Sequence, residues 1–286
     1  MVQVHHRPPQ NRLQPITACR KPFGRLRAID TQRSVSDLWS IAREQLRALF
    51  EAVEGAEVLW RDNSLLGITG GPSADFNMCL VDDSLHVEEI LAESIHRLNL
   101  RRVPGVFMVS AQAADKVGGR IAALGLSEAG EAPMMVFTGQ PSAVSAGYHV
   151  TQVDNETDLA VVADLVASAF DLDRAWIGRT FASPALLASS DAVQFFIAKA
   201  TGRPMSTLTT TGAGSVVGIW SMATWPEAQR RGAGKAALLG AIERKQACGA
   251  ELFYLIATPA GQPLYVATGF KTVETFPLFV FGSAAH

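Results

Sequence analysis

Three cationic residues and two glycines lie between an apolar segment and a helix-forming segment in the C-terminal half of the chain. The cations are Arg230, Arg231 and Lys235, and Gly232 and Gly234 stand among them. The first turn of a helix presents unpaired N–H groups and the positive end of the helix dipole, and glycines let a ligand approach the backbone. Basic side chains add charge-assisted hydrogen bonds to phosphate oxygens. The stretch predicts a phosphate-binding loop; the alternative is a basic helix start after a glycine turn.

The flanking segments must position this loop. Residues 215–224 are apolar and rich in Val, Ile and Trp, which is typical of a buried strand. The sequence Trp225-Pro226-Glu227-Ala228 ends the strand, because proline cannot donate to a ladder. A helix-forming segment, residues 236–247, follows the loop. The predicted order is therefore strand, glycine loop and helix.

Three kinds of phosphate-binding loop have this order. A Walker A loop needs glycine where Gln229 stands and Ser or Thr where Ala236 stands, so it does not fit. A dinucleotide fingerprint matches the letters Gly232-Ala233-Gly234, but it directly follows its strand and requires an acid at the end of the next strand. Here residues 225–231 intervene, and the next strand, 252–257, ends without an acid. An NAD(P)-dependent oxidoreductase is therefore the weaker alternative.

The third kind fits better. The pattern Gln229-x-x-Gly232-x-Gly234, after a strand and Thr-Trp-Pro-Glu, resembles the acyl-CoA pyrophosphate loop of the GNAT acetyltransferase superfamily. A second buried strand at 252–257 follows, and then Leu264-Tyr265-x-x-x-Gly269-Phe270, which resembles the end of the family's closing helix. Two motifs in the right order and at the right separation are more specific than either alone. The resemblance covers roughly residues 148–286.

This resemblance implies an N-acetyltransferase that uses acetyl-CoA as cosubstrate and acetylates an amine of a small molecule or peptide. By this resemblance, the end of the strand at 215–224 would pair with the pantetheine arm, and the loop would hold the pyrophosphate. Thr258 stands where the family often has an Asn that reaches the pantetheine. The implied acetyl-CoA contacts are Met222, Ala223, Thr224, Gln229, Arg230, Arg231, Gly232, Ala233, Gly234, Lys235, Ala236 and Thr258. A non-catalytic acyl-CoA-binding regulatory module is the alternative.

Tyr265 holds the position of the family's common general acid. A phenol with a pKa of about 10 is protonated at neutral pH and can donate to a departing thiolate. The other interpretation is a half-buried tyrosine whose hydroxyl faces water. Residues 216–224 contain no carboxylate, so the general base is not identified; Asp171, Asp173 and Arg174 are candidates for an acceptor wall or plain loop charges.

The predicted elements before Gly147 follow the same order as those after it. In the first half we expect strands at 23–29, 58–60, 65–68, 76–81, 106–109 and 134–137 and helices at 38–53, 87–100 and 112–124. In the second half we expect strands at 148–153, 193–199, 205–211, 216–223, 252–257 and 278–281 and helices at 157–170, 185–189, 236–247 and 264–268. Because Pro263 is costly inside a helix, the last helix should begin near residues 261–262.

The fold class expected is α/β of the α+β type, with two tandem GNAT folds, each a mostly antiparallel mixed sheet flanked by helices. We expect a flexible tail at 1–20, a degenerate domain at 21–140, a linker at 141–147 and an intact domain at 147–286. The first domain lacks the phosphate loop, because the chain before its helix at 87–100 is acidic and free of glycine. Such a loop would repel a pyrophosphate. The cleft between the domains would help to select the acceptor.

Composition limits the function further. The chain has 286 residues, of which 48% are hydrophobic, so it can form two cores. A net charge of −2 argues against nucleic-acid and membrane-surface partners. The three cysteines, Cys19, Cys79 and Cys248, do not have the spacing of metal ligands, and we expect reduced thiols of a cytoplasmic protein. We expect the side chains of His5-His6 to be solvated, so no metal is expected. There is no apolar run of the ~20 residues that span a bilayer and no signal-peptide core. We expect a monomer or homodimer.

Overall fold

The computed structural model describes residues 31–82, 85–140, 147–181, 183–188, 192–212 and 214–282. Several sequence predictions lie outside the described residues: the tail at 1–20, the strand at 23–29, most of the linker at 141–147, Cys19 and the pair His5-His6. Of the predicted acidic segment before residue 87, Asp83 and Ser84 also lie outside them.

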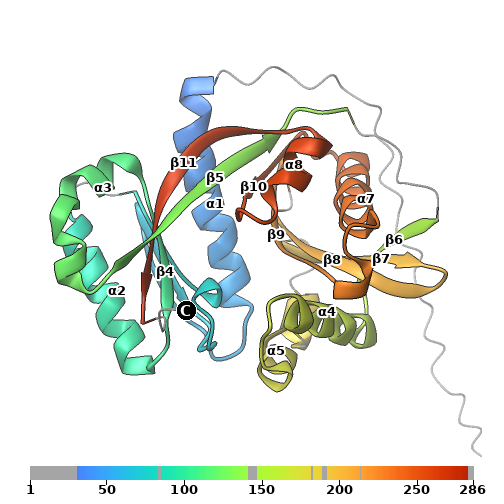
Figure 1. The fold of residues 1–286 in the computed structure, drawn as a ribbon, viewed down its shortest axis with the longest axis horizontal. Helices are drawn as coiled ribbons and strands as arrows, with labels where there is room; N and C mark the ends of the chain where they lie inside the picture. Colours follow the sequence, from blue (N-terminus) through green and yellow to red (C-terminus); the bar gives the residue numbers. More distant parts are fainter. Residues whose placement is uncertain are drawn as a thin grey trace, which may run out of the picture.

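The described strands form one 11-stranded sheet in the order β1-β2-β3-β4-β11-β5-β10-β9-β8-β7-β6 (Figure 1). The strands are β1 (Glu57–Arg61), β2 (Ser64–Ile68), β3 (Asn77–Val81), β4 (Gly105–Val109), β5 (Ser127–Phe137), β6 (Tyr148–Gln152), β7 (Val193–Ala200), β8 (Arg203–Thr211), β9 (Val216–Thr224), β10 (Leu252–Ile256) and β11 (Phe270–Phe281). The α-helices are α1 (Thr31–Glu51), α2 (Val87–Arg101), α3 (Ala111–Val117), α4 (Glu156–Ala169), α5 (Arg174–Phe181), α6 (Pro184–Ala188), α7 (Ala233–Ala247) and α8 (Gln262–Thr268).

The sheet is mixed and mostly antiparallel, as the sequence predicted. The parallel pairs are β3 with β4 and β9 with β10, and the other recorded pairs are antiparallel. We call the described residues up to 140 the N-lobe and those from 147 the C-lobe. In each lobe a parallel strand pair is connected through one helix, α2 in the N-lobe and α7 in the C-lobe.

The two lobes exchange strands at the centre of the sheet. β11, at the end of the chain, lies between β4 and β5, whereas β5, from before the linker, lies between β11 and β10. Figure 1 shows these two long strands running side by side from one lobe to the other. Each lobe's sheet is therefore completed by a strand of the other lobe. The domain limits 21–140 and 147–286 stay a prediction, but the C-lobe sheet includes a strand from before residue 140.

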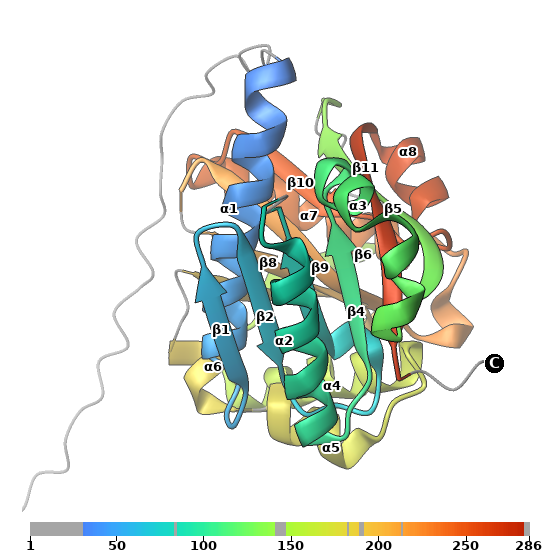
Figure 2. The ribbon, with the colours of Figure 1, turned by 90° about the vertical axis from the view of Figure 1, so that its left-hand side faces the viewer.

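Helices cover both faces of the sheet. α2 and α3 pack on one face of the N-lobe strands and α1 on the other (Figure 2). In the C-lobe, α7 covers the face that carries Phe196 and Phe253, and α4 lies on the opposite face. The core around α1 and α4 is continuous through both lobes, with Trp39 of α1 stacked on Phe276 of β11 at 4.0 Å. On this face of the sheet, the two lobes therefore share an apolar core at the place where the sequence predicted a cleft between two domains.

Some elements differ from the prediction. The helix expected at 112–124 is present but shorter: α3 ends at Val117 because Gly118 adopts φ 49°, and two short 3-10 helices follow, η2 (Gly118–Arg120) and η3 (Ala122–Leu124). α5 has no predicted counterpart. β5 and β11 are much longer than the expected strands at 134–137 and 278–281, because their polar or proline-containing parts are held by pairing with each other.

In the described part of the chain, none of the helices combines the length and apolar character that crossing a membrane requires. Cys79 is buried and Cys248 is exposed, and both are free thiols. Burial raises the pKa of the Cys79 thiol to about 12, so this side chain is a neutral packing residue.

Candidate functional site

The parallel strands β9 and β10 stop pairing before β9 ends. Their ladder joins residues 216–219 of β9 to residues 252–255 of β10. β9 then continues to Thr224 without β10, while β10 stays attached to β5 through Ile256 and Met134. We call this divergence of the two strand ends the β9/β10 splay. It leaves one backbone edge of β9 available to pair with an extended ligand.

A β-bulge explains why β9 turns away at this point. The register of β9 with β8 shifts between Trp220 and Ala223, and Ser221 inside the bulge has φ 46°. A left-handed conformation at a non-glycine residue is uncommon, and a bulge bends and twists its strand. The end of β9 is nevertheless firmly held on its other side. The Ser206 hydroxyl of β8 donates to the Ala223 carbonyl at 2.7 Å and lies 2.8 Å from the Thr224 hydroxyl oxygen.

The predicted loop follows directly. A short 3-10 helix, η4 (Pro226–Ala228), ends the strand, and Arg230 and Gly232 then adopt φ 61° and 89°. α7 begins at Ala233, three residues earlier than the helix predicted at 236–247. The Gly232 carbonyl accepts the first helical hydrogen bond, from the Ala236 amide at 2.9 Å. The amides of residues 233–235 therefore have no intrahelical acceptor and point out of the helix N-terminus.

Gly234 joins this helix end to the splay. A Cβ atom at Gly234 would lie 3.0 Å from Met222 Cε and 3.3 Å from Thr224 Oγ1. Contacts below about 3.4 Å leave no room for a larger side chain without displacement of the neighbours. Glycine thus allows the first turn of α7 to lie directly against the end of β9, and the predicted strand end and loop form one site.

The cations of the loop are exposed or half-buried. Arg230 and Arg231 are exposed and Lys235 is half-buried. Among the ion pairs recorded for the described residues, none involves these three side chains. Positive charge at a helix N-terminus is unfavourable unless an anion offsets it. The loop therefore has the electrostatic character of an anion site.

The sequence prediction did not identify Tyr148, which supports the loop from β6. Its hydroxyl donates to the Arg231 carbonyl at 2.9 Å, and its ring lies 4.0 Å from the position of a Cβ at Gly232. This hydrogen bond ties up a carbonyl that would otherwise add negative charge to the loop. Tyrosine in a first strand carries no signal for this role, because the contact joins residues 83 positions apart.

α8 begins where the sequence predicted. Gly261 precedes its first turn, and Pro263 stands within that turn, where a missing N–H is tolerated. Thr258 caps the turn before the helix: its side-chain oxygen accepts from the Gly261 amide at 3.2 Å. Its side chain is exposed and has this local role in the structure.

Tyr265 of α8 lies at the splay. Its hydroxyl is 3.7 Å from the Met222 sulfur, and its ring packs edge-on to Phe270 with centroids 5.9 Å apart. Burial raises the pKa of Tyr265 to about 12, so the hydroxyl is protonated at neutral pH and can donate a proton or a hydrogen bond. The structure thus brings together Tyr265, the strand end and the glycine loop.

Two of the three candidate charges for an acceptor wall, Asp173 and Arg174, have local structural partners. Asp173 accepts from the Trp176 amide at 2.6 Å and so caps α5, and Arg174 pairs with Asp164 at 2.5 Å. Neither contact involves the splay. These side chains hold α5 in place, and the loop-charge interpretation explains them.

Glu274 of β11 is a carboxylate that sequence reasoning missed. It pairs across the sheet with Met134 of β5, which in turn pairs with Ile256 of β10. Directly opposed residues share a face, at about 5 Å per strand, which places Glu274 roughly 10 Å from Ile256 at the splay. Met134 and Ile256 pack in the core on the face opposite α7. Burial, and then the charge of Asp82, raise the pKa of Glu274 above its ordinary range.

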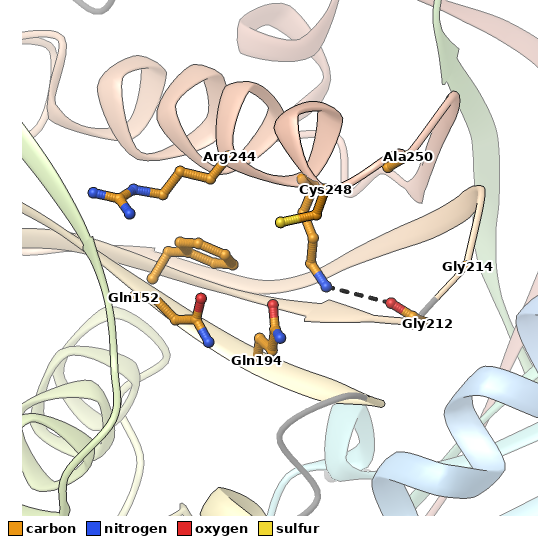
Figure 3. Close-up of a pocket in the computed structure, with 9 residues that line it drawn as sticks. Gln152, Gln194, Gly212, Gly214, Arg244, Cys248 and Ala250 are labelled. Carbon is orange, nitrogen blue, oxygen red and sulfur yellow. Dashed lines mark hydrogen bonds between the residues drawn. The ribbon is translucent and has the colours of Figure 1, made fainter. Parts of the chain in front are cut away.

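A separate cavity of about 310 Å³ lies at the other end of α7. Figure 3 shows Gln152 and Gln194 on one side of it and Arg244 and Cys248 on the other. Lys245 Nζ donates to the Gly212 carbonyl at its edge, at 3.3 Å. α7 is about 20 Å long at 1.5 Å per residue, so this cavity is remote from the glycine loop. It contributes no residue to the site around Tyr265.

No curated protein sequence matches the chain. The sequence profile of the acetyltransferase (GNAT) family matches residues 162–270, a range that contains β9, the glycine loop, α7 and α8. The match therefore includes every predicted site residue and begins inside α4.

Solved structures resemble most of the chain, including both lobes. A GCN5-related N-acetyltransferase from Kribbella flavida has a TM-score of 0.58 at 15% identity, and the alignment covers 86% of this chain and 96% of that one. A tandem GNAT protein from the clavulanic acid biosynthesis pathway has a TM-score of 0.54 at 14% identity, covering 90% and 96%. A GCN5-related N-acetyltransferase from Sphaerobacter thermophilus has a TM-score of 0.53 at 13% identity, covering 86% and 93%.

At these identities the structural likeness establishes the fold, whereas the sequence profile adds a family match over residues 162–270. Both findings agree with the glycine loop and closing helix from which the family was expected. The chain thus has the fold of tandem GNAT proteins, and residues 162–270 of its C-lobe match the GNAT acetyltransferase family.

Proposed function

We propose that this protein is an N-acetyltransferase that binds acetyl-CoA at the β9/β10 splay and transfers the acetyl group to an amine. The observation that carries the proposal is the position of the Tyr265 hydroxyl, 3.7 Å from the Met222 sulfur at the end of β9. A protonated donor, an unpaired strand edge and a helix N-terminus with glycines converge there. These groups would hold a CoA thioester and protonate its departing sulfur.

The residues present fit acetyl-CoA. The amides of residues 233–235 and the side chains of Arg230 and Arg231 would bind the pyrophosphate, and Gly234 leaves the space beside Met222 that a Cβ would fill. The backbone of residues 222–224 would pair with the amides of the pantetheine arm. Acetyl-CoA supplies an activated acyl group as a thioester. Thr258 would act through its turn cap rather than by direct contact.

In the proposed transfer, the amine nitrogen bonds to the acyl carbon and the carbon–sulfur bond breaks. Tyr265 donates its proton to the departing sulfur, which a hydroxyl with a pKa of about 12 can do because it is fully protonated at neutral pH. Such a donor typically contributes ~10²–10⁴ in rate.

Glu274 is our candidate for accepting the proton that the amine must lose. α7 and α8 cover the face of the splay on which Met222 and Tyr265 pack, so the amine would approach from the opposite face, where Glu274 lies. At roughly 10 Å from Ile256, the carboxylate would act through an intervening water. Its raised pKa makes it a stronger base than an ordinary glutamate.

The alternatives have less support. The dinucleotide fingerprint belongs to doubly wound parallel sheets, whereas the strands here are mostly antiparallel. An acyl-CoA-binding module without turnover would need the loop but not a phenol at the end of the splay.

The experiment that tests the proposal is a thermal-shift assay with acetyl-CoA, CoA, NAD and NADP, followed by assays of CoA release with a panel of amines. A ligand at 100 times its Kd stabilises the folded state by ~2.7 kcal/mol, which a melting curve detects. Stabilisation by acetyl-CoA and CoA is expected. Stabilisation by NAD or NADP instead would favour the oxidoreductase.

A further inference from the structure

A partly buried hydrogen-bond network joins α1 of the N-lobe to the three C-lobe strands that lead to the splay. Gln45 of α1 is its centre. Its Nε2 donates to the Val216 carbonyl of β9 at 2.9 Å, and its Oε1 accepts from Thr211 of β8 at 3.0 Å and from Tyr254 of β10 at 2.9 Å. The Thr211 oxygen in turn accepts from Trp220 Nε1 at 2.8 Å. One carboxamide therefore connects β8, β9 and β10.

The strands are shaped to admit this side chain. A Cβ at Gly212 would lie 2.5 Å from Gln45 Nε2, and a Cβ at Gly218 would lie 2.7 Å from the Tyr254 hydroxyl. Thr211 and Tyr254 are fully buried. Burial raises the pKa of Tyr254, so its hydroxyl remains a donor. A buried hydroxyl that loses its hydrogen-bond partner carries the full cost of its desolvation, which makes the network sensitive to the loss of Gln45.

The network ends at the point where the splay begins. The last paired residues of the parallel ladder are Ile219 and Leu255. Trp220 is the next residue of β9, and Ser221, with φ 46°, starts the bulge that turns the strand away. Trp220 also packs edge-on to Tyr254, with ring centroids 5.9 Å apart. Gln45 thus fixes, through Thr211, the side chain that precedes the bulge.

A second N-lobe element holds the other strand of the splay. β5 pairs with β10 through residues 134–136 and 254–256, the part of β10 from which β9 departs. β10 keeps its direction because β5 binds it, and β9 departs at the bulge. The N-lobe therefore holds β10 directly where the strands separate, and it reaches β9 there through Thr211 and Trp220.

We propose that Gln45 is a positioning residue of the acetyl-CoA site: through Thr211, Trp220 and Tyr254 it sets where β9 leaves β10, so that the N-lobe serves the C-lobe as a brace for the splay. This inference rests on the proposed function, because it assigns the splay to acetyl-CoA. Gln45 does not touch the site around Tyr265 itself. It acts through the strands that build it.

The test is calorimetric titration of acetyl-CoA into the full-length protein and three variants, well below their melting temperatures. Gln45→Met keeps the side-chain length and removes all hydrogen bonds of the carboxamide. Tyr254→Phe removes one of them and keeps the ring. Phe76→Leu is the control, since it loosens another inter-lobe contact, the packing of Phe76 on Trp176 at 5.3 Å.

A positioning role predicts that Gln45→Met raises the Kd for acetyl-CoA roughly tenfold and Tyr254→Phe roughly threefold. Phe76→Leu should lower the melting temperature and leave the Kd unchanged, which separates positioning from a general loss of stability. A wild-type Kd in folded Gln45→Met would overturn the inference and leave the proposed function standing. If Gln45→Met does not fold, an unchanged Kd in Tyr254→Phe overturns it. Absence of acetyl-CoA binding by the wild type would refute the proposed function itself.

Discussion

The two parallel strand pairs of this protein have the same connection and different ends. In the N-lobe, β3 pairs with β4 over residues 78–81 and 106–109, and the Ser110 amide extends the ladder to the Val81 carbonyl at 2.9 Å. In the C-lobe, pairing stops at Ile219 and Leu255 while β9 continues to Thr224. The N-lobe pair is closed up to its end, and the C-lobe pair is open.

The segments that follow β3 and β9 also differ in their charge and glycine content. β3 leads to Asp82 and then to α2, whose first turn contains Glu88 and Glu89. β9 leads to Gly232 with φ 89° and to α7, whose first turn has no acidic residue. Acidic residues near a helix N-terminus satisfy the helix dipole and repel an anion, whereas glycine and cations leave the dipole available. This difference is why we propose the thioester site at the C-lobe pair, where the ladder opens and the first turn of the helix is free of acid.

The largest effect is expected from a side chain that fills the space between the first turn of α7 and the end of β9. Gly234→Val should abolish measurable acetyl-CoA binding, raising the Kd at least about 100-fold, because a side chain at this position would collide with Met222 and Thr224. Calorimetric titration measures it. Gly178→Ala is the matched control, since no atom lies within 4 Å of a Cβ there. If folded Gly234→Val retained its affinity for acetyl-CoA, the glycine loop would not be the phosphate-binding site, and it would not explain the difference between the two strand pairs.

Tyr265→Phe should separate chemistry from binding. We expect kcat to fall by ~10²–10⁴, the range for loss of a general acid, with an unchanged Kd for acetyl-CoA. Steady-state assays of CoA release, with calorimetry alongside, test it. If Tyr265→Phe turned over at the wild-type rate, Tyr265 would be a packing residue rather than the general acid.

Glu274→Gln should lower kcat at neutral pH by about tenfold or more, since a carboxylate that accepts a proton is lost. In the wild type, the rate should fall as the pH drops through the raised pKa of Glu274, because only the ionised form is a base. A wild-type rate that stays constant as the pH is lowered from neutral into the acidic range would contradict the assignment.

The same variant makes a stability prediction with a defined sign. A carboxyl whose pKa is raised in the folded state stabilises the protein below its ordinary pKa, and this contribution is lost as the pH rises through the raised value. Glu274→Gln should therefore melt at a higher temperature than the wild type at neutral pH, and the difference should shrink in acid. Melting curves across this pH range decide it. A Glu274→Gln protein that melts lower at neutral pH would mean that the ionised carboxylate has a stabilising partner.

The smallest effect concerns the support of the loop. Tyr148→Phe removes the hydrogen bond to the Arg231 carbonyl, worth about 1 kcal/mol, and should raise the Kd for acetyl-CoA about fivefold with kcat unchanged. Titration of both proteins under the same salt conditions measures it, because loop cations make binding salt-dependent. An unchanged Kd would show that Gly232 and Arg230 hold the loop without help.

The N-lobe is expected not to bind acetyl-CoA. Full-length Gly234→Val tests this too, since it leaves the N-lobe loop intact. Binding at one site in the wild type and at none in the variant is the expected result. Residual stoichiometric binding in the variant would show that the closed pair can also hold the ligand.

The sequence by itself determined those parts of the protein that depend on interactions between residues close to one another in the chain. The apolar run of β9, the break at Pro226 and the glycines before α7 follow from strand propensity, the missing proline N–H and the geometry of a helix N-terminus. Pro263 likewise marked the start of α8. These signals suffice to predict the family of the C-lobe and to name Tyr265.

Tertiary structure alone decided how the lobes share their sheet and where the splay begins. β5 and β11 are long because each is paired along its length, and half of β5 is polar and exposed, so no hydrophobic pattern reveals it. Gln45 lies 171 residues from Val216 and 209 from Tyr254, and one glutamine on an amphipathic helix reads as a surface residue until the fold is known. Hydrogen bonds and strand pairing between distant segments leave no periodic trace in sequence, since each partner satisfies only its own local pattern.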